Sequence, residues 1–599
     1  MVILKNKAVE YSEENFRAEA TELLAIAGSA SHLEVARQRL FDRVTRYQFD
    51  VFCEEIGLPE GKIMRVRDCA RALRSVLKAR SDTLAGFSVT QVFFDLAKRV
   101  PRPELKAAFF ADLTHIVMGL EARGSPESPM DFSISARLTG RRAALARSTE
   151  LDRLGARAER WMQRYVHGLM ESVQAKRRAN RDKILDKLNA SCDDWEDWRW
   201  HISHVIRDAD TVLSLISATE DEIKGVRAAK EACIPFGVTP YYLSLMDDRP
   251  TQDDRTVRAQ VFPNIDYVNE MSEYRESNEC TLDFMQEHET SPVDLVTRRY
   301  PGIVIFKPYN TCPQICVYCQ RNWEITDVLA EDALASSDRI DEALAWIQAH
   351  PTIHEVLVTG GDPLAMDDDT LREILAKVAE IPSVERIRIG SRTPVTLPMR
   401  ITPDLVRLLG SLRIPGRREV AVVTHVEHPY EITPDMVLAV DRLRREGIPV
   451  YNQLVYTFFV SRRFEATLLR RLLRLVGIDP YYTFNTKGKD ETKAYRVPIA
   501  RLLQEQKEEA RMLPGLARTD EPVFNVPGSG KNYLRASQHH DLLTILPTGA
   551  RVYEFHPWES NIAPQSTYVG EDIPILDYLN RLAKIGEDSS DYETIWYYF

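Results

Sequence analysis

The sequence predicts an α/β fold in which a partial barrel of six strand–helix units follows a long all-helical region. Residues 1 to about 190 place apolar side chains three and four positions apart, the spacing of amphipathic helices, and carry no strand signal. From about residue 300, short β-rich runs alternate with amphipathic helical stretches. Because these runs are nearly continuously apolar, we expect parallel strands covered on both faces, as in a closed or partly closed α/β barrel.

Length and composition indicate an ordinary globular chain of several folded units. The 599 residues exceed a typical domain of roughly 100 to 200 residues, so two or three units are expected. Hydrophobic residues make up 44% and charged residues 28%, and no run approaches the roughly 18 apolar residues of a membrane span. The first 20 residues turn acidic and amphipathic too soon for a signal peptide. We therefore expect a soluble, cytoplasmic protein without membrane contact.

The charge distribution argues against a nucleic-acid partner. The net charge is −11 and the 78 basic residues are dispersed along the chain, whereas nucleic-acid surfaces concentrate positive charge. We expect a small substrate instead. An arginine-rich stretch at residues 134–161 is interpreted as a helix whose arginines form a solvated face.

Helical spacing fills the first part of the chain. The predicted helices there are residues 16–28, 32–57, 62–81 and 104–124. The chain is divided into a helical accessory region (1–190), a helical segment that leads into and wraps the barrel (191–295), the barrel with its sites (296–535) and a C-terminal segment (536–599). The first region could serve as a dimerisation surface, a docking site for a reductant or a lid. The aromatic tail at 591–599 is expected to pack on the barrel or on the N-terminal helices.

Six strands are predicted for the barrel, with helical stretches such as 369–381 and 434–447 between them. The strands are residues 303–310, 355–362, 386–392, 421–426, 450–456 and 481–485. In such barrels the chemistry collects at the C-terminal ends of the strands. The polar motifs described next follow these ends, which makes that edge of the sheet the expected site.

Three of the eight cysteines stand close together directly after the first predicted strand. Cys312, Cys316 and Cys319 have the spacing C-x3-C-x2-C, which in a reducing compartment favours metal or cluster ligation over disulfides. Three thiolates are one short of a cuboidal cluster, and this leaves an iron open to bind and cleave a ligand. Zinc is the competing interpretation, but no second ligand pair follows at zinc spacing. The remaining cysteines are interpreted as inert thiols: Cys53, Cys69, Cys192, Cys233 and Cys280.

With Tyr318 before the last cysteine, this loop resembles the signature of the radical S-adenosylmethionine (SAM) superfamily. The resemblance implies a [4Fe-4S] cluster on the three cysteines, SAM bound at the open iron, and an electron donor such as flavodoxin or ferredoxin. The turn Gly360-Gly361-Asp362 resembles the glycine-rich motif that contacts the SAM amino group. The resemblance also implies that three further residues contact SAM: Tyr318, Ser391 and His425.

A narrower resemblance, over roughly residues 193–560, is to the branch of pyridoxal 5′-phosphate (PLP) dependent aminomutases typified by lysine 2,3-aminomutase. Its landmarks appear at residues 195–206, 240–247, 297–302, 390–402, 424–433, 451–454 and 526–531. Lys531, in a glycine-rich loop, matches the lysine that forms the internal aldimine with PLP. The alternatives are a surface turn lysine or a degenerate phosphate loop, although Val526 and Asn532 stand where a phosphate loop needs glycine and serine or threonine.

The same matching assigns further residues to PLP. Arg299 and Tyr300 fall where the family contacts the phosphate, and Gln453 lies on a barrel strand facing the cofactor. A second family arginine near the phosphate is replaced here by Ile303. Lys307 is a candidate replacement cation.

The substrate is predicted from the charges that would surround it. Arg321 matches the arginine that binds the substrate α-carboxylate. Where the lysine enzyme holds a distal ammonium with two aspartates, this chain has Lys487 and Asn525. An ammonium beside Lys487 would lack a counterion in a desolvated pocket, whereas a carboxylate would be paired. These positions resemble glutamate 2,3-aminomutase, which implies conversion of L-glutamate to β-glutamate; alternatively Lys487, like Lys489, points to solvent.

Other outcomes stay open at this point. The alternatives are an aminomutase for aspartate, glutamine or lysine, a radical SAM enzyme that dehydrates, decarboxylates or epimerises, and a non-catalytic scaffold. The mechanism implied by the resemblance has the adenosyl radical remove a β-hydrogen from the PLP-bound substrate, after which nitrogen migrates from Cα to Cβ. No cysteine follows Cys319, so the C-terminal zinc site of the lysine enzyme is not expected, and whether the chain forms a homo-oligomer is left open.

Overall fold

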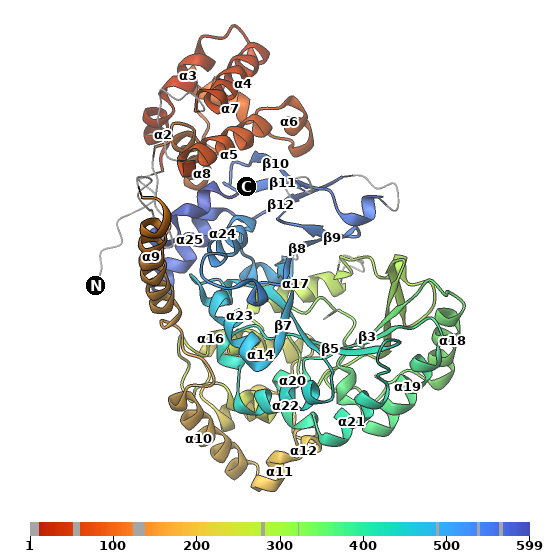
Figure 1. Cartoon of the computed structure of the whole chain (residues 1–599). Helices are drawn as coiled ribbons and strands as arrows, with labels where there is room; N and C mark the ends of the chain where they lie inside the picture. Colours follow the sequence, from red (N-terminus) through yellow and green to blue (C-terminus); the bar gives the residue numbers. More distant parts are fainter. Residues whose placement is uncertain are drawn as a thin grey trace.

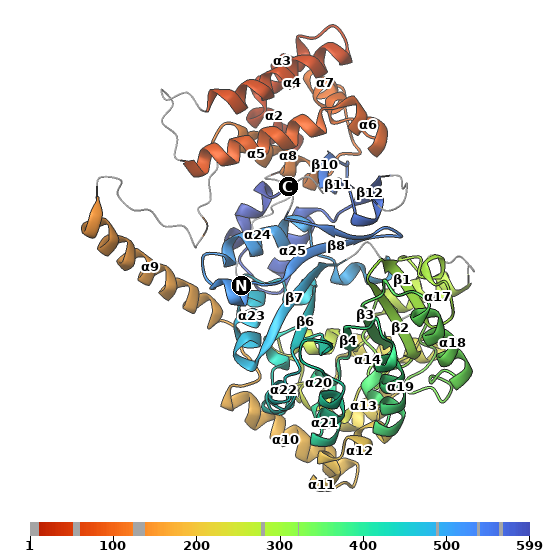
Figure 2. The ribbon, with the colours of Figure 1, turned by 45° about the vertical axis from the view of Figure 1, so that its right-hand side comes forward.

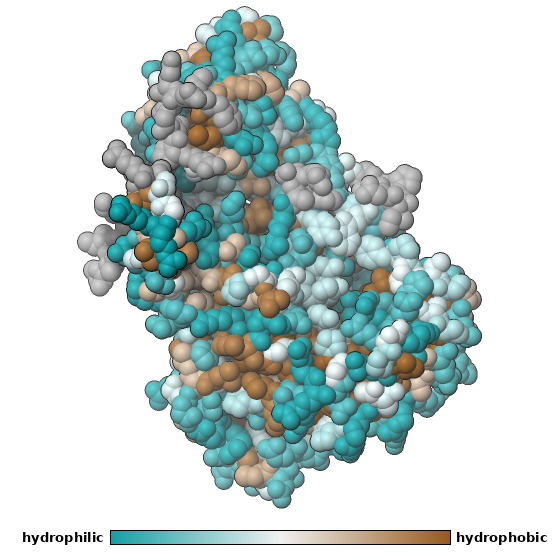
Figure 3. Space-filling view, in the orientation of Figure 1, coloured by the Kyte–Doolittle hydropathy of each residue, from teal (hydrophilic) through white to brown (hydrophobic). Residues whose placement is uncertain are grey.

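The computed structural model of the chain describes residues 11–51, 60–123, 128, 138–276, 282–321, 323–486, 490–535, 540–561 and 567–599. Within these ranges, no helix is long and apolar enough to cross a membrane. The face seen in Figure 3 is mainly hydrophilic, with apolar side chains in scattered groups. Figure 1 shows the N-terminal helices at one end of the molecule, the barrel at the other, and the C-terminal sheet between them.

Seven helices in the described part of the chain form an N-terminal bundle. They are α2 (Glu13–Glu19), α3 (Thr21–Gly28), α4 (Leu33–Asp50), α5 (Glu60–Val76), α6 (Ala79–Ala85), α7 (Val89–Ala97) and α8 (Ala107–Leu120). Apolar faces of the neighbouring helices meet around α8, which is buried along most of its length. The predicted helix over 62–81 is two helices, because Lys78 adopts an extended backbone and starts α6. The end of the predicted helix over 32–57 lies outside the described residues.

Helix α9 (Gly140–Met162) projects from the rest of the molecule along most of its length (Figure 2). Its buried side chains all lie in its C-terminal half: Leu154, Ala158 and Met162. Arg471 Nη1 pairs with Glu159 Oε1 at 2.5 Å and attaches this end to a barrel helix. Most of its arginines are exposed, so the predicted solvated face is confirmed for the helical residues, while residues 134–137 of that stretch lie outside the described residues.

A series of short helices leads from α9 into the barrel. They are α10 (Glu171–Lys187), α11 (Cys192–Glu196), α12 (Trp198–Ser203), α13 (Ala209–Leu215), α14 (Glu220–Glu231), α15 (Pro240–Ser244), α16 (Arg255–Ala259) and α17 (Ile265–Glu276). Two backbone hydrogen bonds join this segment to the cysteine loop: Ile315 N–H donates to the Gly237 carbonyl at 3.0 Å, and Val317 N–H to the Gln260 carbonyl at 2.9 Å. The segment therefore supports the loop from outside the barrel.

The core is a nine-stranded sheet whose strands lie in chain order. They are β1 (Val296–Tyr300), β2 (Ile303–Tyr309), β3 (Glu355–Gly360), β4 (Arg386–Gly390), β5 (Glu419–Thr424), β6 (Val450–Tyr456), β7 (Ile478–Asn485), β8 (Glu521–Val526) and β9 (Gly530–Tyr533). Neighbours from β2 to β8 are parallel, and β1 and β9 run antiparallel at the two edges. The helices that cover the outer face are α18 (Ser337–Gln348), α19 (Asp368–Glu380), α21 (Pro403–Ser411), α22 (Pro434–Arg445), α23 (Glu465–Val476) and α24 (Ile499–Glu509).

The six predicted strands are confirmed, and β8 adds a seventh parallel strand that the pattern does not predict. The expectation of strands buried on both faces is wrong for most of them. Along β2, β3 and β6, buried residues alternate with half-buried ones. The buried set faces the helices, while the half-buried set faces a hollow interior, which leaves room for ligands inside the barrel.

The C-terminal part joins the bundle to the barrel. Strands β10 (His540–Ile545), β11 (Arg551–Phe555) and β12 (Tyr568–Glu571) form an antiparallel sheet, followed by α25 (Ile575–Lys584) and a 3-10 segment, Ser589–Tyr597. Trp596 stacks on His115 of α8 with ring centroids 4.6 Å apart. Tyr592 OH accepts a hydrogen bond from the Arg463 N–H just before α23, at 2.8 Å. The aromatic tail thus contacts both of the partners expected for it.

Breaking a buried ion pair at this junction is expected to destabilise the fold strongly. Arg551 binds Asp112 through two hydrogen bonds of 2.8 Å, and each side chain is 1% exposed. Asp112→Ala would leave the guanidinium buried without its carboxylate, so we expect the free energy of unfolding to fall by about 3–5 kcal/mol, measured by chemical denaturation. Asp369→Ala removes an exposed partner of Arg372 and should change little; equal effects would contradict the prediction.

Candidate active site

The cysteine loop follows β2 at the C-terminal end of the barrel strands. Cys312, Cys316 and Cys319 are free and half-buried. Burial raises the pKa of the Cys312 and Cys316 thiols, and Arg392, whose Nη1 lies 2.8 Å from Cys316 Sγ, opposes that rise at Cys316. The Arg321 N–H donates to Cys319 Sγ at 3.4 Å. Because donors to sulfur stabilise cluster-bound thiolates, this set of residues fits a [4Fe-4S] cluster.

Arg392 joins the cysteine loop to two other strand ends and is not among the predicted site residues. Its Nη2 donates to Glu431 Oε1 at 2.6 Å and its Nε to the His425 carbonyl at 3.2 Å. Glu431 is fully buried and also accepts from Tyr242 OH at 2.6 Å. The signal available in the sequence was a charged residue within the landmark at 390–402.

The glycine-rich turn after β3 lies directly against the cysteine loop. Gly361 N–H donates to the Tyr309 carbonyl at 2.7 Å, and Asp362 N–H to the Thr311 carbonyl at 2.9 Å. A Cβ on Gly361 would lie 2.0 Å from the Thr311 carbonyl oxygen, and Gly360 has a φ of +112°. Both positions therefore require glycine. The close approach brings this turn to the cysteines, where SAM is predicted to bind.

Asp362 and Ser391 meet at the ends of β3 and β4. Ser391 Oγ donates to Asp362 Oδ1 at 2.7 Å, while the N–H groups of Arg392 and Thr393 donate to Oδ2 at 2.9 and 3.0 Å. Burial raises the pKa of Asp362, although these hydrogen bonds oppose the rise. The carboxylate therefore fixes the turn after β4 relative to the turn after β3.

Tyr318, His425 and Gln453 are linked by hydrogen bonds between the cysteine loop and β6. Tyr318 OH lies 2.7 Å from His425 Nε2, and His425 Nδ1 lies 2.7 Å from the Gln453 carbonyl oxygen. Burial lowers the pKa of His425 to about 4, so the ring is neutral near pH 7 and Nδ1 carries the proton that the carbonyl accepts. This contact fixes β6 relative to the cysteine loop.

The interior of the barrel is a cavity of about 630 Å³ lined by residues of β1 to β4 and β6 to β9, with neighbouring loops. Five of the predicted site residues line it: Arg299, Tyr300, Gln453, Asn525 and Lys531. Four of these are the residues predicted for PLP, and the fifth is one of those predicted for the substrate. The structure therefore brings together residues that are up to 232 positions apart in sequence, from Arg299 to Lys531.

Lys531 lies on strand β9 and points into the barrel. It pairs with Asn525 of β8, and the turn before it contains Gly528 and Gly530, both with positive φ. The sequence suggested a loop here, but the glycine turn is short enough for β9 to form directly after it. The interpretation as a surface turn lysine is wrong, because Lys531 lines the cavity.

Aromatic rings and a nearby arginine set the electrostatics of Lys531. Its Nζ lies 5.2, 5.3 and 6.0 Å from the ring centroids of Tyr300, Tyr482 and Trp558. Burial, followed by the positive charge of Arg388, lowers the pKa of Lys531 to about 8. A larger fraction of this amine is therefore neutral near pH 7 than for an ordinary lysine, as a nucleophilic lysine requires.

Arg299 and Tyr300, the last two residues of β1, lie near Lys531 of β9. Tyr300 OH accepts a hydrogen bond from the Lys531 N–H at 3.3 Å. Arg299 Nη1 pairs with Glu559 Oε2 at 2.9 Å, and both side chains are 9% exposed. Arg299 Nη2 has no hydrogen-bond partner among the described residues. A buried guanidinium donor of this kind fits a phosphate oxygen, so the cavity suits PLP.

Arg321 belongs to a cluster of four charged side chains next to the cavity. Its two terminal nitrogens pair with Glu287 and Glu324. Lys307 Nζ lies 3.3 Å from Glu287 Oε2 and 3.6 Å from Glu324 Oε1. Although burial opposes it, the charges of Arg321 and Lys307 hold the pKa of Glu287 below its usual value. Lys307, the candidate replacement for the missing phosphate arginine, thus pairs with these two carboxylates and does not line the cavity.

Only one of the two residues predicted at the distal end of the substrate is described. Lys487 lies outside the described residues. Asn525 is half-buried on β8 and lines the cavity. Its amide can both donate and accept hydrogen bonds.

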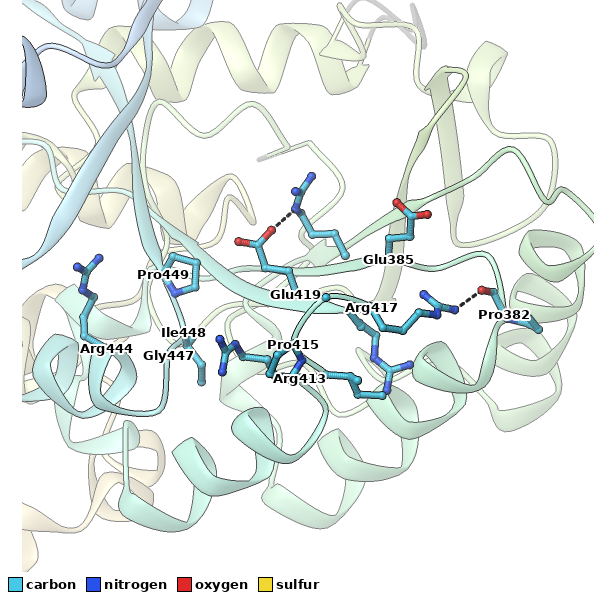
Figure 4. Close-up of a pocket in the computed structure, with 14 residues that line it drawn as sticks. Pro382, Glu385, Arg413, Pro415, Arg417, Glu419, Arg444, Gly447, Ile448 and Pro449 are labelled. Carbon is cyan, nitrogen blue, oxygen red and sulfur yellow. Dashed lines mark hydrogen bonds and ion pairs between the residues drawn. The ribbon is translucent and has the colours of Figure 1, made fainter.

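A second hollow, of about 910 Å³, lies at the opposite, N-terminal end of the strands (Figure 4). Its lining is rich in arginine and includes Arg413 and Arg417, and Arg417 donates to the Pro382 carbonyl. Glu385 and Arg386 line both hollows. Among the described residues predicted for the site, none lines this second hollow, so the candidate active site is the barrel cavity with the loops at its C-terminal end.

The cysteine loop, the glycine-rich turn and the parallel barrel define the chain as a radical SAM enzyme. Residues 306–461 match the family model described as the radical SAM superfamily. This range begins within β2, contains the three cysteines and extends just beyond β6.

Within this class, the chain belongs to the KamA family. It is 40% identical over 609 aligned residues to an uncharacterized KamA family protein of Methanocaldococcus jannaschii, and the alignment covers 96% of each chain. The predicted family resemblance is therefore confirmed, and it extends over the N-terminal helices as well as the barrel.

Two named aminomutases match a shorter part of the chain. L-lysine 2,3-aminomutase of Bacillus subtilis is 36% identical over 178 residues, 30% of this chain and 35% of that protein. Glutamate 2,3-aminomutase of Clostridioides difficile is 34% identical over 194 residues, 32% of this chain and 42% of that protein. Radical SAM aminomutases of this family are isomerases that use a [4Fe-4S] cluster, SAM and PLP. Because the two enzymes match to a similar extent, the identities favour neither substrate.

Proposed function

We propose that the chain is a PLP-dependent radical SAM 2,3-aminomutase that moves the amino group of an acidic amino acid from Cα to Cβ, converting L-glutamate to β-glutamate. The observation that carries this proposal is Lys531, a lysine with a pKa lowered to about 8 inside the barrel cavity. An amine that is partly neutral near pH 7 can react with an aldehyde. Membership of the KamA family supports the same assignment.

Three groups of residues would hold the cofactors. The cluster ligands are Cys312, Cys316 and Cys319. The residues proposed for SAM are Tyr318, Gly360, Gly361, Asp362, Ser391 and His425. Those proposed for PLP are Lys531, Arg299, Tyr300 and Gln453. When bound, the cluster and SAM supply a carbon radical, and PLP supplies the π system that permits nitrogen migration. The chain orients these groups and keeps water away from them.

Arg321 is proposed to bind the substrate α-carboxylate. In the structure its guanidinium pairs with Glu287 and Glu324. A substrate carboxylate that replaces one of them at the guanidinium leaves Arg321 paired with two carboxylates, as it is in the structure. The displaced Glu287 would retain Lys307, whose Nζ lies 3.3 Å from its Oε2. This arrangement lowers the desolvation cost of the exchange.

The preference for a carboxylate at the distal end rests on Asn525 and Lys487. Asn525 presents an uncharged amide to the cavity, and the sequence supplies Lys487 as the cation at the second position. An amide and a cation pair with a carboxylate, whereas an ammonium would meet a like charge without a counterion. Glutamate therefore suits this pair better than lysine does.

A negative charge introduced at position 525 should weaken the binding of glutamate. Asn525→Asp places a carboxylate in the cavity, so we expect kcat/KM for glutamate to fall by roughly 100-fold or more, or about 2.7 kcal/mol of transition-state stabilisation. Steady-state assays of β-glutamate formation would measure it. Asn525→Ser, which changes size without adding charge, is the matched control and should retain more activity. A smaller loss for Asp than for Ser would count against a distal carboxylate at this position.

The substrate assignment is tested by anaerobic reconstitution with iron, sulfide, SAM, PLP and a reductant. The enzyme is then incubated separately with glutamate, aspartate, glutamine and lysine, and the products are identified by mass spectrometry. We expect a β-amino acid from glutamate. A β-amino acid from lysine alone would overturn the substrate assignment but keep the reaction class, while a dehydrated, decarboxylated or epimerised product would overturn the reaction class.

A radical SAM enzyme needs an external electron for its cluster. We propose a small low-potential protein such as flavodoxin or ferredoxin as the donor. The half-buried free thiols Cys312, Cys316 and Cys319 stay reduced in a cytosolic environment, which is where we place the protein. Comparing SAM cleavage with reduced flavodoxin and with dithionite would test the donor.

A further inference from the structure

Arg388 is a basic side chain inside the barrel that has not been assigned to a cofactor or to the substrate above. It lies on β4 with its side chain 12% exposed, and it lines the same cavity as Lys531. Its Nη1 lies 3.0 Å from Tyr481 OH and 3.1 Å from Glu355 Oε1. Its buried Nε has no hydrogen-bond partner among the described residues. A buried guanidinium donor left unpaired is costly, so an acceptor is expected to reach it.

Ile303 stands where the family has a second arginine near the phosphate. The register of the sheet places Arg388 close to the height of Ile303 along the barrel. Ile303 of β2 pairs with Glu355 of β3, and Leu357, one lumen-facing position further along β3, pairs with Arg388 of β4. Arg388 therefore enters the cavity one row above Ile303 and two strands away, about 10 Å at the usual strand spacing. A long side chain can span much of that distance.

The other cations near this end of the cavity have partners of their own. Lys307, which does not line the cavity, pairs with Glu287 and Glu324. Arg386 pairs with Glu355 and Glu419 and is 49% exposed. Among the described cations that line the cavity, Arg299 and Arg388 each keep a buried nitrogen without a hydrogen-bond partner.

Arg388 and Lys531 flank the same pair of tyrosines. Arg388 binds Tyr481, the Tyr481 and Tyr482 ring centroids are 4.2 Å apart, and Lys531 Nζ lies 5.3 Å from the Tyr482 ring centroid. PLP carries its aldehyde and its phosphate on one aromatic ring, so its site needs an amine and a cation about a ring apart. The tyrosine pair supplies that separation along a wall on which an aromatic ring can stack.

We propose that Arg388 is a phosphate-binding residue of the PLP site and supplies the cation that Ile303 cannot. This inference rests on the proposed function. A planar guanidinium suits a phosphate because it can donate two parallel hydrogen bonds. Glu355 would not be left unpaired when Arg388 turns to a phosphate, because Arg386 Nη1 lies 2.9 Å from its other carboxylate oxygen.

The test compares PLP with pyridoxal, which has the same aldehyde without the phosphate. Each is titrated into the full-length protein and trapped on Lys531 with borohydride, and the modified peptide is quantified by mass spectrometry. Arg388→Met is expected to weaken PLP capture by roughly 10- to 100-fold, the loss typical of a hydrogen bond to a charged group, and to affect pyridoxal by much less. If the substitution changes the reactivity of Lys531 itself, capture of PLP and of pyridoxal changes by the same factor. The ratio of PLP capture to pyridoxal capture then stays the same.

Two further variants keep the result interpretable. Arg298→Met removes the neighbouring arginine of β1, which binds the Pro301 carbonyl and Thr352 on the exterior, and should leave the ratio unchanged. Arg388→Lys keeps the charge without the planar fork and should lose less affinity for PLP than Arg388→Met. If Arg388→Met does not fold, an unchanged ratio in Arg388→Lys and Arg388→Gln overturns the inference.

The outcomes separate this inference from the proposed function. Capture of PLP by the wild-type protein with an unchanged PLP-to-pyridoxal ratio in Arg388→Met overturns the phosphate role of Arg388 alone. Equal weakening of both compounds assigns Arg388 to packing or to Lys531 and also overturns it. A wild-type protein that captures neither compound overturns the proposed function and the inference together.

Discussion

Replacing Cys316 with alanine is expected to abolish the iron–sulfur cluster and every activity that depends on it. The other two thiols cannot hold a cuboidal cluster that already leaves one iron open. The variant also removes the sulfur that Arg392 Nη1 approaches at 2.8 Å, and so the contact that ties the loop to β4. Because loss of residues around a metal site alone costs about 10- to 100-fold in activity, we expect loss of the ligand itself to exceed that range.

The cluster prediction is measured by iron and sulfide content after anaerobic reconstitution and by formation of 5′-deoxyadenosine from SAM. Cys192→Ala and Cys233→Ala, at exposed thiols elsewhere in the chain, are matched controls and should keep the wild-type iron content. Circular dichroism checks that Cys316→Ala is folded. A folded Cys316→Ala protein that retains four irons and cleaves SAM would show that Cys316 is not a ligand.

The parts of the fold that could be predicted are those encoded by local patterns. The six barrel strands are short β-rich runs between amphipathic helices, and each was recognisable without knowing its neighbours. Strand β8 (Glu521–Val526) is not among the predicted strands, and Pro522, which cannot donate to a ladder, weakens the local signal for a strand there. It forms nevertheless, since Pro522 stands near its start and the strand pairs with β7 and β9 on its two sides. Such pairing depends on distant segments.

The candidate site shows the same division between local and distant information. The cysteine loop is a compact motif whose spacing favours cluster ligation, and the lysine after the glycine turn was assigned through its resemblance to a compact family motif. The partners of the basic residues could not be predicted. Arg299 contacts Glu559, 260 positions away, and Arg388 contacts Tyr481, 93 positions away. A single sequence contains nothing that links such pairs before the barrel closes around them.

A common arrangement emerges from these distant contacts. Three arginines in or beside the cavity each pair with a glutamate. The pairs are Arg299–Glu559, Arg321–Glu287 and Arg388–Glu355. An anionic ligand would therefore meet arginines that already hold a carboxylate, and would bind through the nitrogens left without a partner at Arg299 and Arg388 or displace a glutamate at Arg321. The pairing keeps the arginines oriented and lowers the cost of holding them in a partly desolvated barrel.

Replacing Lys531 with alanine is expected to abolish covalent capture of PLP and to lower turnover by roughly 1,000-fold or more, the scale of losing a covalent nucleophile. Only the neutral amine can attack the aldehyde carbon. With a pKa of about 8, about 10% of the Lys531 amine is neutral at pH 7, against about 0.03% for a lysine at 10.5. Burial and Arg388 thus raise the reactive fraction about 300-fold.

The same pKa predicts the pH dependence of PLP capture by the wild-type protein. The rate should rise about tenfold per pH unit below pH 8, because deprotonation produces the nucleophile, and level off above it. Stopped-flow absorbance at a series of pH values would measure this profile, and borohydride trapping would show whether capture is at Lys531. Lys377→Ala is the matched control, because Lys377 is a surface lysine whose pKa is raised by its bonds to Asp341 and Glu373. A profile that keeps rising to pH 10 would mean that the amine titrates as an ordinary lysine and that burial in the barrel does not activate it.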